Sequence, residues 1–297
     1  MTGAEKGFLL LCSQLGNPER KTLTVAQLRV LGQRVRQMIV DDPDRRLCQA
    51  DLRAMGYGDD MARRIVALLE DEELLDYYCR VGQRRACTCL SRISACYPAV
   101  LQQKLGDDSP GCLWTKGDIS LLSMPRIALV GSRELSEENR RFAAEVGCQA
   151  ALQGYVLVSG NARGADKTAQ DACLKAGGKV ISVVADRLDS HSAKENVLYV
   201  SEDGFDCDFS AQRAISRNRV IHALAEKTFV AQSGYQTGGT WDGTVKNLRF
   251  GWSAVYCYAD GSPAQMLLQE MGANVIEMTR LEEIAQLDDL AVSFFDT

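Results

Sequence analysis

The sequence is poor in histidine and in long hydrophobic runs, and it lacks a common phosphate-binding motif. His191 and His222 are the only two histidines among 297 residues. No histidine therefore accompanies Cys79, Cys87 and Cys89, whose spacing fits no zinc pattern, and we expect ordinary thiols there. No apolar run approaches the roughly 18 residues of a membrane-spanning helix. No G-K-[ST] tripeptide occurs, which excludes a Walker phosphate loop. The chain's start lacks a basic leader and a small-residue cleavage site, so we expect no signal peptide.

Positive net charge is also missing, because the chain carries a formal charge of −5. Residues 1–95 hold 15 basic and 13 acidic residues, and the remainder holds 19 and 26. Any site for a polyanion must therefore be a local patch. The 11 cysteines are scattered and odd in number. Such usage is typical of reduced thiols, so we expect a cytoplasmic protein without a membrane anchor.

The first 95 residues read as a small all-helical domain. Thr24 is a candidate N-cap for a helix whose apolar residues recur at helical spacing from Val25 to Ile39. The breaker "DDPD" at 41–44 follows. The next stretch resembles a helix-hairpin-helix with a turn at Gly56-Tyr57-Gly58. Such a turn can present backbone N–H groups to a phosphate, but Asp59 and Asp60 would repel one. We therefore interpret this helix pair as packing.

From Arg126 onward the pattern alternates between short apolar strands and amphipathic helices. Strands are expected in "RIALVGS", "YVLVSG", "KVISVVA", "KTFVAQS", "SAVYCYA" and "NVIEM", with helices between them. Crossover helices between strands imply an α/β fold, a Rossmann-like doubly wound and mainly parallel sheet. We therefore predict two domains, a helical one at 1–95 and a Rossmann-like one at 96–297. Residues 92–118 are expected to form a connector that packs on the second domain.

Small residues, hydroxyls and arginines gather where the predicted strands end. Ligands of such sheets bind beyond the carboxyl ends of the strands. Glycine permits close backbone approach, and arginine offers a fork that suits phosphate. Three strand ends are expected to converge, at Gly131-Ser132-Arg133, at Ser159-Gly160 with Arg163-Gly164, and at Ser233-Gly234 with Gly238-Gly239-Thr240. A helix over "FSAQRAISRNRVIHALAEK" could add its arginines to the same crevice or leave them in solvent. The aromatic residues Tyr235, Trp241 and Trp252 are expected nearby.

Taken in order, these segments resemble the DprA/Smf family of DNA-processing proteins. "IALVGSRELS", "VSGNARGAD", "GGKVISVVADRLD" and "SRNRVIHAL" are similar to the family's successive motifs, and the resemblance covers roughly Tyr97 to Ala273. It implies binding of single-stranded DNA in a basic pocket, a homodimer, and delivery of DNA to the RecA recombinase in recombination or natural transformation. The pocket that it implies comprises Gly131, Ser132, Arg133, Ser159, Gly160, Arg163, Gly164, Asp166, Arg217, Asn218 and Arg219. Gln170 stands where the family usually has a histidine.

A second hypothesis rests on the Gly238-Gly239-Thr240 segment. It resembles the phosphate loop of nucleotide-binding relatives, among them the nucleoside-monophosphate phosphoribohydrolases. Those enzymes need a glutamate a few residues after the loop, and Asp242 is the only carboxylate in that neighbourhood here. The alternatives are thus a DNA-binding protein that is not an enzyme and a nucleotide sensor or N-glycosidase. We favour the first, with no metal, no cofactor and no catalytic residue assigned.

Overall fold

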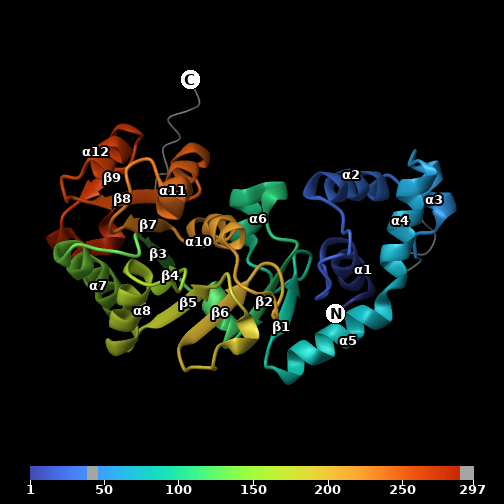
Figure 1. Ribbon diagram of the computed structural model, residues 1–297, viewed down its shortest axis with the longest axis horizontal. Helices are drawn as coiled ribbons and strands as arrows, with labels where there is room; N and C mark the ends of the chain where they lie inside the picture. Colours follow the sequence, from blue (N-terminus) through green and yellow to red (C-terminus); the bar gives the residue numbers. More distant parts are fainter. Residues whose placement is uncertain (39–45, 288–297) are drawn as a thin grey trace.

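The structure, a computed structural model, describes residues 1–38 and 46–287 and contains one nine-stranded sheet (Figure 1). The strands, in chain order, are β1 (Thr88–Ser91), β2 (Cys112–Lys116), β3 (Arg126–Val130), β4 (Val156–Ser159), β5 (Lys179–Val183), β6 (Val197–Ser201), β7 (Lys227–Val230), β8 (Ala254–Tyr258) and β9 (Asn274–Ile276). Their order in the sheet is β1-β2-β6-β5-β4-β3-β7-β8-β9.

The seven strands β6, β5, β4, β3, β7, β8 and β9 are parallel. Next to them, β2 pairs antiparallel with β6, and β1 pairs antiparallel with β2. The predicted α/β class is confirmed. Strand order reverses between β3 and β7, which lie side by side, so the carboxyl ends of these strands form the switch point of the sheet.

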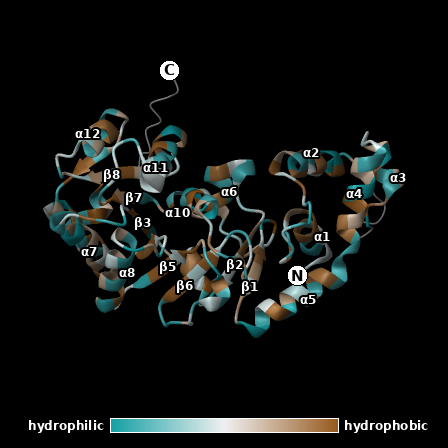
Figure 2. Cartoon of the chain, viewed as in Figure 1, coloured by the Kyte–Doolittle hydropathy of each residue, from teal (hydrophilic) through white to brown (hydrophobic). Residues whose placement is uncertain are grey.

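Successive side chains of a strand point to opposite faces of the sheet. Both faces of this sheet carry apolar side chains, and helices cover both of them. One hydrophobic layer joins the strands to α7 (Glu137–Leu152), α8 (Ala165–Lys175) and the 3₁₀ segment η4 (Met278–Gln286). The other layer joins them to α6 (Ala99–Leu105), α10 (Asn218–Leu224), α11 (Gly238–Phe250) and α12 (Pro263–Glu270). Figure 2 shows the central strands as mainly hydrophobic, as a sheet buried on both faces requires.

The N-terminal region is helical, as expected, and forms a core of its own. Its helices are α1 (Gly3–Cys12), α2 (Val25–Arg36), α3 (Gln49–Ala54), α4 (Asp59–Glu70) and α5 (Glu72–Arg84). Thr24 caps α2, and the turn between α3 and α4 contains Gly56 at φ +84°. Ile39 and the breaker at 41–44 lie outside the described residues.

An aromatic cluster joins these helices to the sheet. Tyr78 of α5 stacks on Phe205 at a centroid distance of 4.5 Å and meets Trp114 of β2 edge-on at 5.2 Å. The strand β1 lies N-terminal to residue 96 yet pairs with β2. The division at residue 95 stays a prediction.

Two local expectations were wrong. The helix expected over 209–227 is two helices, α9 (Ala211–Ser216) and α10, which meet at Arg217. The expected connector contains the fully buried strand β2. Within the described residues, no helix has the length and apolar character needed to cross a membrane.

Candidate functional site: a cationic cavity at the carboxyl edge of the sheet

The turn after β3 is fixed by its two neighbours. The backbone N–H and the hydroxyl of Ser132 both donate to the carbonyl of Gln232, which follows β7, at 2.9 and 3.2 Å. The Ser132 carbonyl in turn accepts from the Ala165 N–H at the start of α8. A Cβ on Gly164, whose φ is +84°, would lie 2.4 Å from the Arg133 carbonyl oxygen. Glycine is therefore required there, because the two turns touch through their backbones.

A cavity of about 210 Å³ opens beside these turns. Its walls come from the segments after β3, β4 and β5 and from the stretch around α9. The lining residues are Arg133, Gly160, Asn161, Ala162, Arg163, Ala185, Asp186, Phe209, Ala214 and Arg217. Three arginines against one aspartate make this cavity cationic, as an anion site requires.

Arg217 forms the buried part of the cationic wall. It is only 7% exposed. The break between α9 and α10 places it over Gly160, where an added Cβ would lie 1.5 Å from its Nη1 atom. Its Nε and Nη1 atoms are buried and have no hydrogen-bond partner in residues 1–38 and 46–287. Burial lowers the pKa of Arg217, but an arginine keeps its proton in proteins. The side chain thus offers unused charged donors to the cavity that it lines.

Asp166 shapes the loop after β4 and does not face solvent. Its Oδ2 atom accepts from the backbone N–H groups of Gly160 and Ala162 at 3.1 and 3.2 Å. Burial raises the pKa of Asp166, whereas Arg217 and the two N–H donors act against that rise. We assign Asp166 to holding this loop, with the charge of Arg217 as the main influence that opposes the rise of its pKa.

The outer wall of the cavity is exposed. Arg133 and Arg163 are both solvent-accessible, and no ion pair joins either to a carboxylate in the described residues. Asp186 pairs with His191 at 3.0 Å, which lowers the pKa of Asp186. Phe209 is 57% exposed at the rim. The sequence argument missed Asp186 and Phe209. Asp186 follows the predicted strand "KVISVVA" but has no glycine beside that strand end, and Phe209 belongs to no strand end.

The third predicted turn lies beside the cavity and not in its lining. The Asn218 side chain donates to the Gly239 carbonyl at 2.9 Å, which ties the start of α10 to the start of α11. Ser233 and Gly234 lead into this turn, and Gly234 forms a bridge with Thr237. Gly238, at φ +87°, and Thr240 lie in the first turn of α11. Asp242, whose side chain is 45% exposed, pairs with Lys246 one helical turn on at 2.8 Å.

Arg219, expected in the pocket, points to another partner. Its Nη1 atom lies 2.7 Å from Glu202, whose side chain is only 7% exposed. Burial raises the pKa of Glu202, and Arg219 opposes this. Arg213 likewise pairs with Asp203 at 2.6 Å. Arginines thus pair closely with two of the four carboxylates in 202–208, whereas Asp208 is 88% exposed and lies 3.8 Å from Arg187.

Other residues predicted for the site pack between the strands and α8 or lie in the core, and they do not line the cavity. Ser159 is buried and accepts a hydrogen bond from the Gln170 side chain at 2.6 Å, which joins the end of β4 to α8. A Cβ on Gly131 would lie 2.5 Å from that of Ala165. Trp252 is buried and stacked on Phe250, so it is not available to a ligand as expected. The described residues hold no cluster of three or more metal-binding side chains.

The sequence matches the family model of DNA recombination-mediator protein A over residues 88–246. The chain is 33% identical to the DNA processing protein DprA of Streptococcus pneumoniae over 158 residues, which are 50% of this chain and 55% of that protein. It is 32% identical to DprA of Bacillus subtilis over 143 residues, 44% of this chain and 48% of that protein. The chain spans about half the length of the curated relatives that it matches.

Solved structures show the same fold. The X-ray structure of DprA from S. pneumoniae superposes with a TM-score of 0.71 at 24% identity, covering 97% of this chain and 99% of that one. DNA processing protein A from Helicobacter pylori, whose structure concerns a single-stranded DNA binding mode, gives a TM-score of 0.56 at 21% identity over 67% of this chain and 95% of that one. Residues 88–246, which the family model matches, include β1 to β7 and every residue that lines the cationic cavity. This chain therefore belongs to the DNA recombination-mediator protein A family.

Proposed function

We propose that this chain binds single-stranded DNA, with a backbone phosphate in the cationic cavity. The observation that carries the proposal is Arg217, a buried guanidinium whose Nε and Nη1 atoms have no partner among the described residues. A buried charged donor without a partner costs free energy that a bound phosphate oxygen would return. The single-stranded DNA binding mode of the H. pylori protein supports the same choice of ligand.

The exposed arginines take a second role in this proposal. Arg133 and Arg163 would pair with phosphates at the rim and release counterions, which makes binding sensitive to salt. Phe209 would stack on an unpaired base next to the bound phosphate. Because a base in a duplex is already stacked and paired, that contact favours single strands.

The remaining parts of the proposal concern the protein's context. We propose that the chain acts as a homodimer in the cytosol and hands the bound strand to the RecA recombinase, in recombination or natural transformation. No step in this role needs a catalytic residue, a metal or a cofactor.

A charge-matched pair of variants tests the DNA-binding proposal. Arg133→Ala with Arg163→Ala removes two exposed charges of the cavity. Arg63→Ala with Arg141→Ala removes two exposed charges elsewhere. With labelled oligothymidine, the first variant is expected to lower the slope of log affinity against log salt by about 1.4, whereas the second leaves it nearly unchanged. Equal affinity and slope for the first variant and the unmodified chain would refute the proposal.

A further inference from the structure

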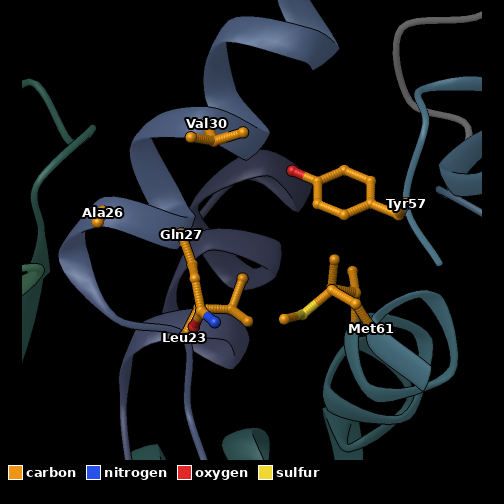
Figure 3. Close-up of a pocket in the computed structure, with 7 residues that line it drawn as sticks. Leu23, Ala26, Gln27, Val30, Tyr57 and Met61 are labelled. Atoms are coloured by element: carbon orange, nitrogen blue, oxygen red, sulfur yellow. The ribbon is translucent and has the colours of Figure 1, made fainter.

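An apolar groove lies in the N-terminal region, far along the chain from the cationic cavity. Its volume is about 220 Å³. Figure 3 shows Ala26 and Val30 of α2 on one side, with Tyr57 and Met61 facing them from the turn before α4 and from α4 itself. Leu23, Gln27 and Ile65 complete the lining. The only side-chain amide, that of Gln27, accepts from the Thr24 N–H at 3.0 Å and so caps α2.

The spacing of the lining residues matches a helical ligand. Ala26 and Val30 are four residues apart on α2, and Met61 and Ile65 are four residues apart on α4. Residues at this spacing form a ridge along one side of a helix. Two such ridges with a groove between them accept the ridge of a third helix, whose apolar residues recur at i, i+4 and i+7.

A polar group at the groove lacks a partner. The Tyr57 hydroxyl is buried and makes no hydrogen bond within residues 1–38 and 46–287. It points toward α2 in Figure 3. The Arg34 guanidinium lies 4.4 Å from the centroid of the same ring. A carboxylate entering here would accept from the hydroxyl and face the arginine, which satisfies a donor that is otherwise orphaned.

The α2 side of the groove carries only basic residues, although the whole chain is acidic. Residues 20–38 contain five basic residues and no acidic residue, and two of the five, Arg20 and Arg29, pair with Asp71 and Asp107. Arg34 and Arg36 pair with no carboxylate in the described part of the chain. The nearby acids at the start of α4 are occupied, since Asp59 and Asp60 pair with Arg53 and Arg63.

We propose that this groove binds an acidic amphipathic helix of a partner protein. The partner's apolar residues fill the space between α2 and α4, and its carboxylates face Arg34, Arg36 and the Tyr57 hydroxyl. The groove suits an apolar helix better than a nucleic acid, because its lining offers the Tyr57 hydroxyl as a single orphaned donor, whereas phosphates and base edges need several. The site is separate from the cavity proposed for single-stranded DNA.

Designed peptides test the proposal on the full chain. The probe is a fluorescein-labelled 15-residue helix (~22 Å long) with leucines at i, i+4 and i+7 and glutamates at the flanking positions. The matched peptide has lysine in place of every glutamate. Fluorescence anisotropy is expected to show the acidic peptide binding about tenfold or more tightly than the basic one. Methyl NMR is expected to place the shifts at Val30, Met61 and Ile65.

Two substitutions on one helix separate groove binding from general loss of structure. Val30→Asp places a carboxylate in the groove and should weaken the acidic peptide about tenfold or more. Val25→Asp makes the same change on α2 at a residue that is 40% exposed and outside the lining, and should have little effect. The proposal is overturned if the basic peptide binds as well as the acidic one, if neither shifts the groove methyl groups, or if oligothymidine shifts them instead.

Discussion

Gly160→Ala is the smallest change that should disable the cationic cavity. The new Cβ would lie 1.5 Å from Nη1 and 2.2 Å from Cζ and Nη2 of Arg217, where ordinary contacts start near 3.4 Å. The guanidinium must therefore retreat by about 2 Å. The backbone of residue 160 tolerates alanine, because Gly160 is not among the glycines with positive φ. The fold should remain, and the charged donors should be displaced.

The expected loss follows from hydrogen-bond geometry. Charged N–H donors must lie within roughly 2.7–2.9 Å of a phosphate oxygen, so a shift of ~2 Å abolishes the contact. Hydrogen bonds to charged groups contribute about 1.5–3 kcal/mol. The dissociation constant for oligothymidine should therefore rise by a factor of about 10 to 150. The salt slope should fall by about 0.7 if one phosphate contact is lost.

Fluorescence anisotropy across a salt series measures both quantities, and urea unfolding checks the fold. Gly58→Ala is the matched control, since a Cβ there meets nothing within 4 Å and its φ is −68°. The control should bind as the unmodified chain does. If Gly160→Ala keeps full affinity and the full salt slope, Arg217 does not hold the phosphate and the reasoning fails.

Three further predictions concern other parts of the site and its support. Burial lowers the pKa of His222 from 6.5 to about 3, so the unfolded chain takes up a proton that the folded chain refuses. The free energy of unfolding should fall by about 2 kcal/mol from pH 7 to pH 5, and less in His222→Gln, as urea titrations at both pH values would show. Arg219→Ala leaves Glu202 buried without its partner and should cost about 3–5 kcal/mol of stability, measured the same way, with single-strand affinity little changed. Phe209→Ala should weaken oligothymidine binding by about 1–3 kcal/mol and Phe209→Trp should not, as anisotropy would report.

Much of the fold could be predicted because its signals are local. Strands such as Arg126–Val130 and Val156–Ser159 are short, mainly apolar runs that a glycine follows, and the helix between them has Ser136 as its cap. The strand β2 could not be found this way. All five of its residues are buried, so it shows no alternation, and its place between β1 and β6 depends on pairing with β6, distant in sequence.

The site was harder to predict because it depends on where helices break. In one straight helix, Arg213 and Arg217 would share a face. The break at Arg217 separates them, so that Arg213 pairs with Asp203, Arg217 turns over Gly160, and Arg219 reaches Glu202. The sequence alone does not distinguish the roles of Arg213, Arg217 and Arg219. Only their burial and partners distinguish the one with unused donors.

The division between buried and exposed arginines has a consequence under the proposed function. Arg133 and Arg163 lie in water, where salt screens them, so they add attraction for any polyanion. Arg217 is buried and screened far less, but it acts only on a phosphate that enters the cavity past Phe209. A flexible single strand can present such a phosphate, whereas a duplex holds its phosphates on a stiff surface. Raising the salt concentration should therefore weaken duplex binding more than single-strand binding. The preference for single strands should grow with ionic strength, and Gly160→Ala should remove that growth.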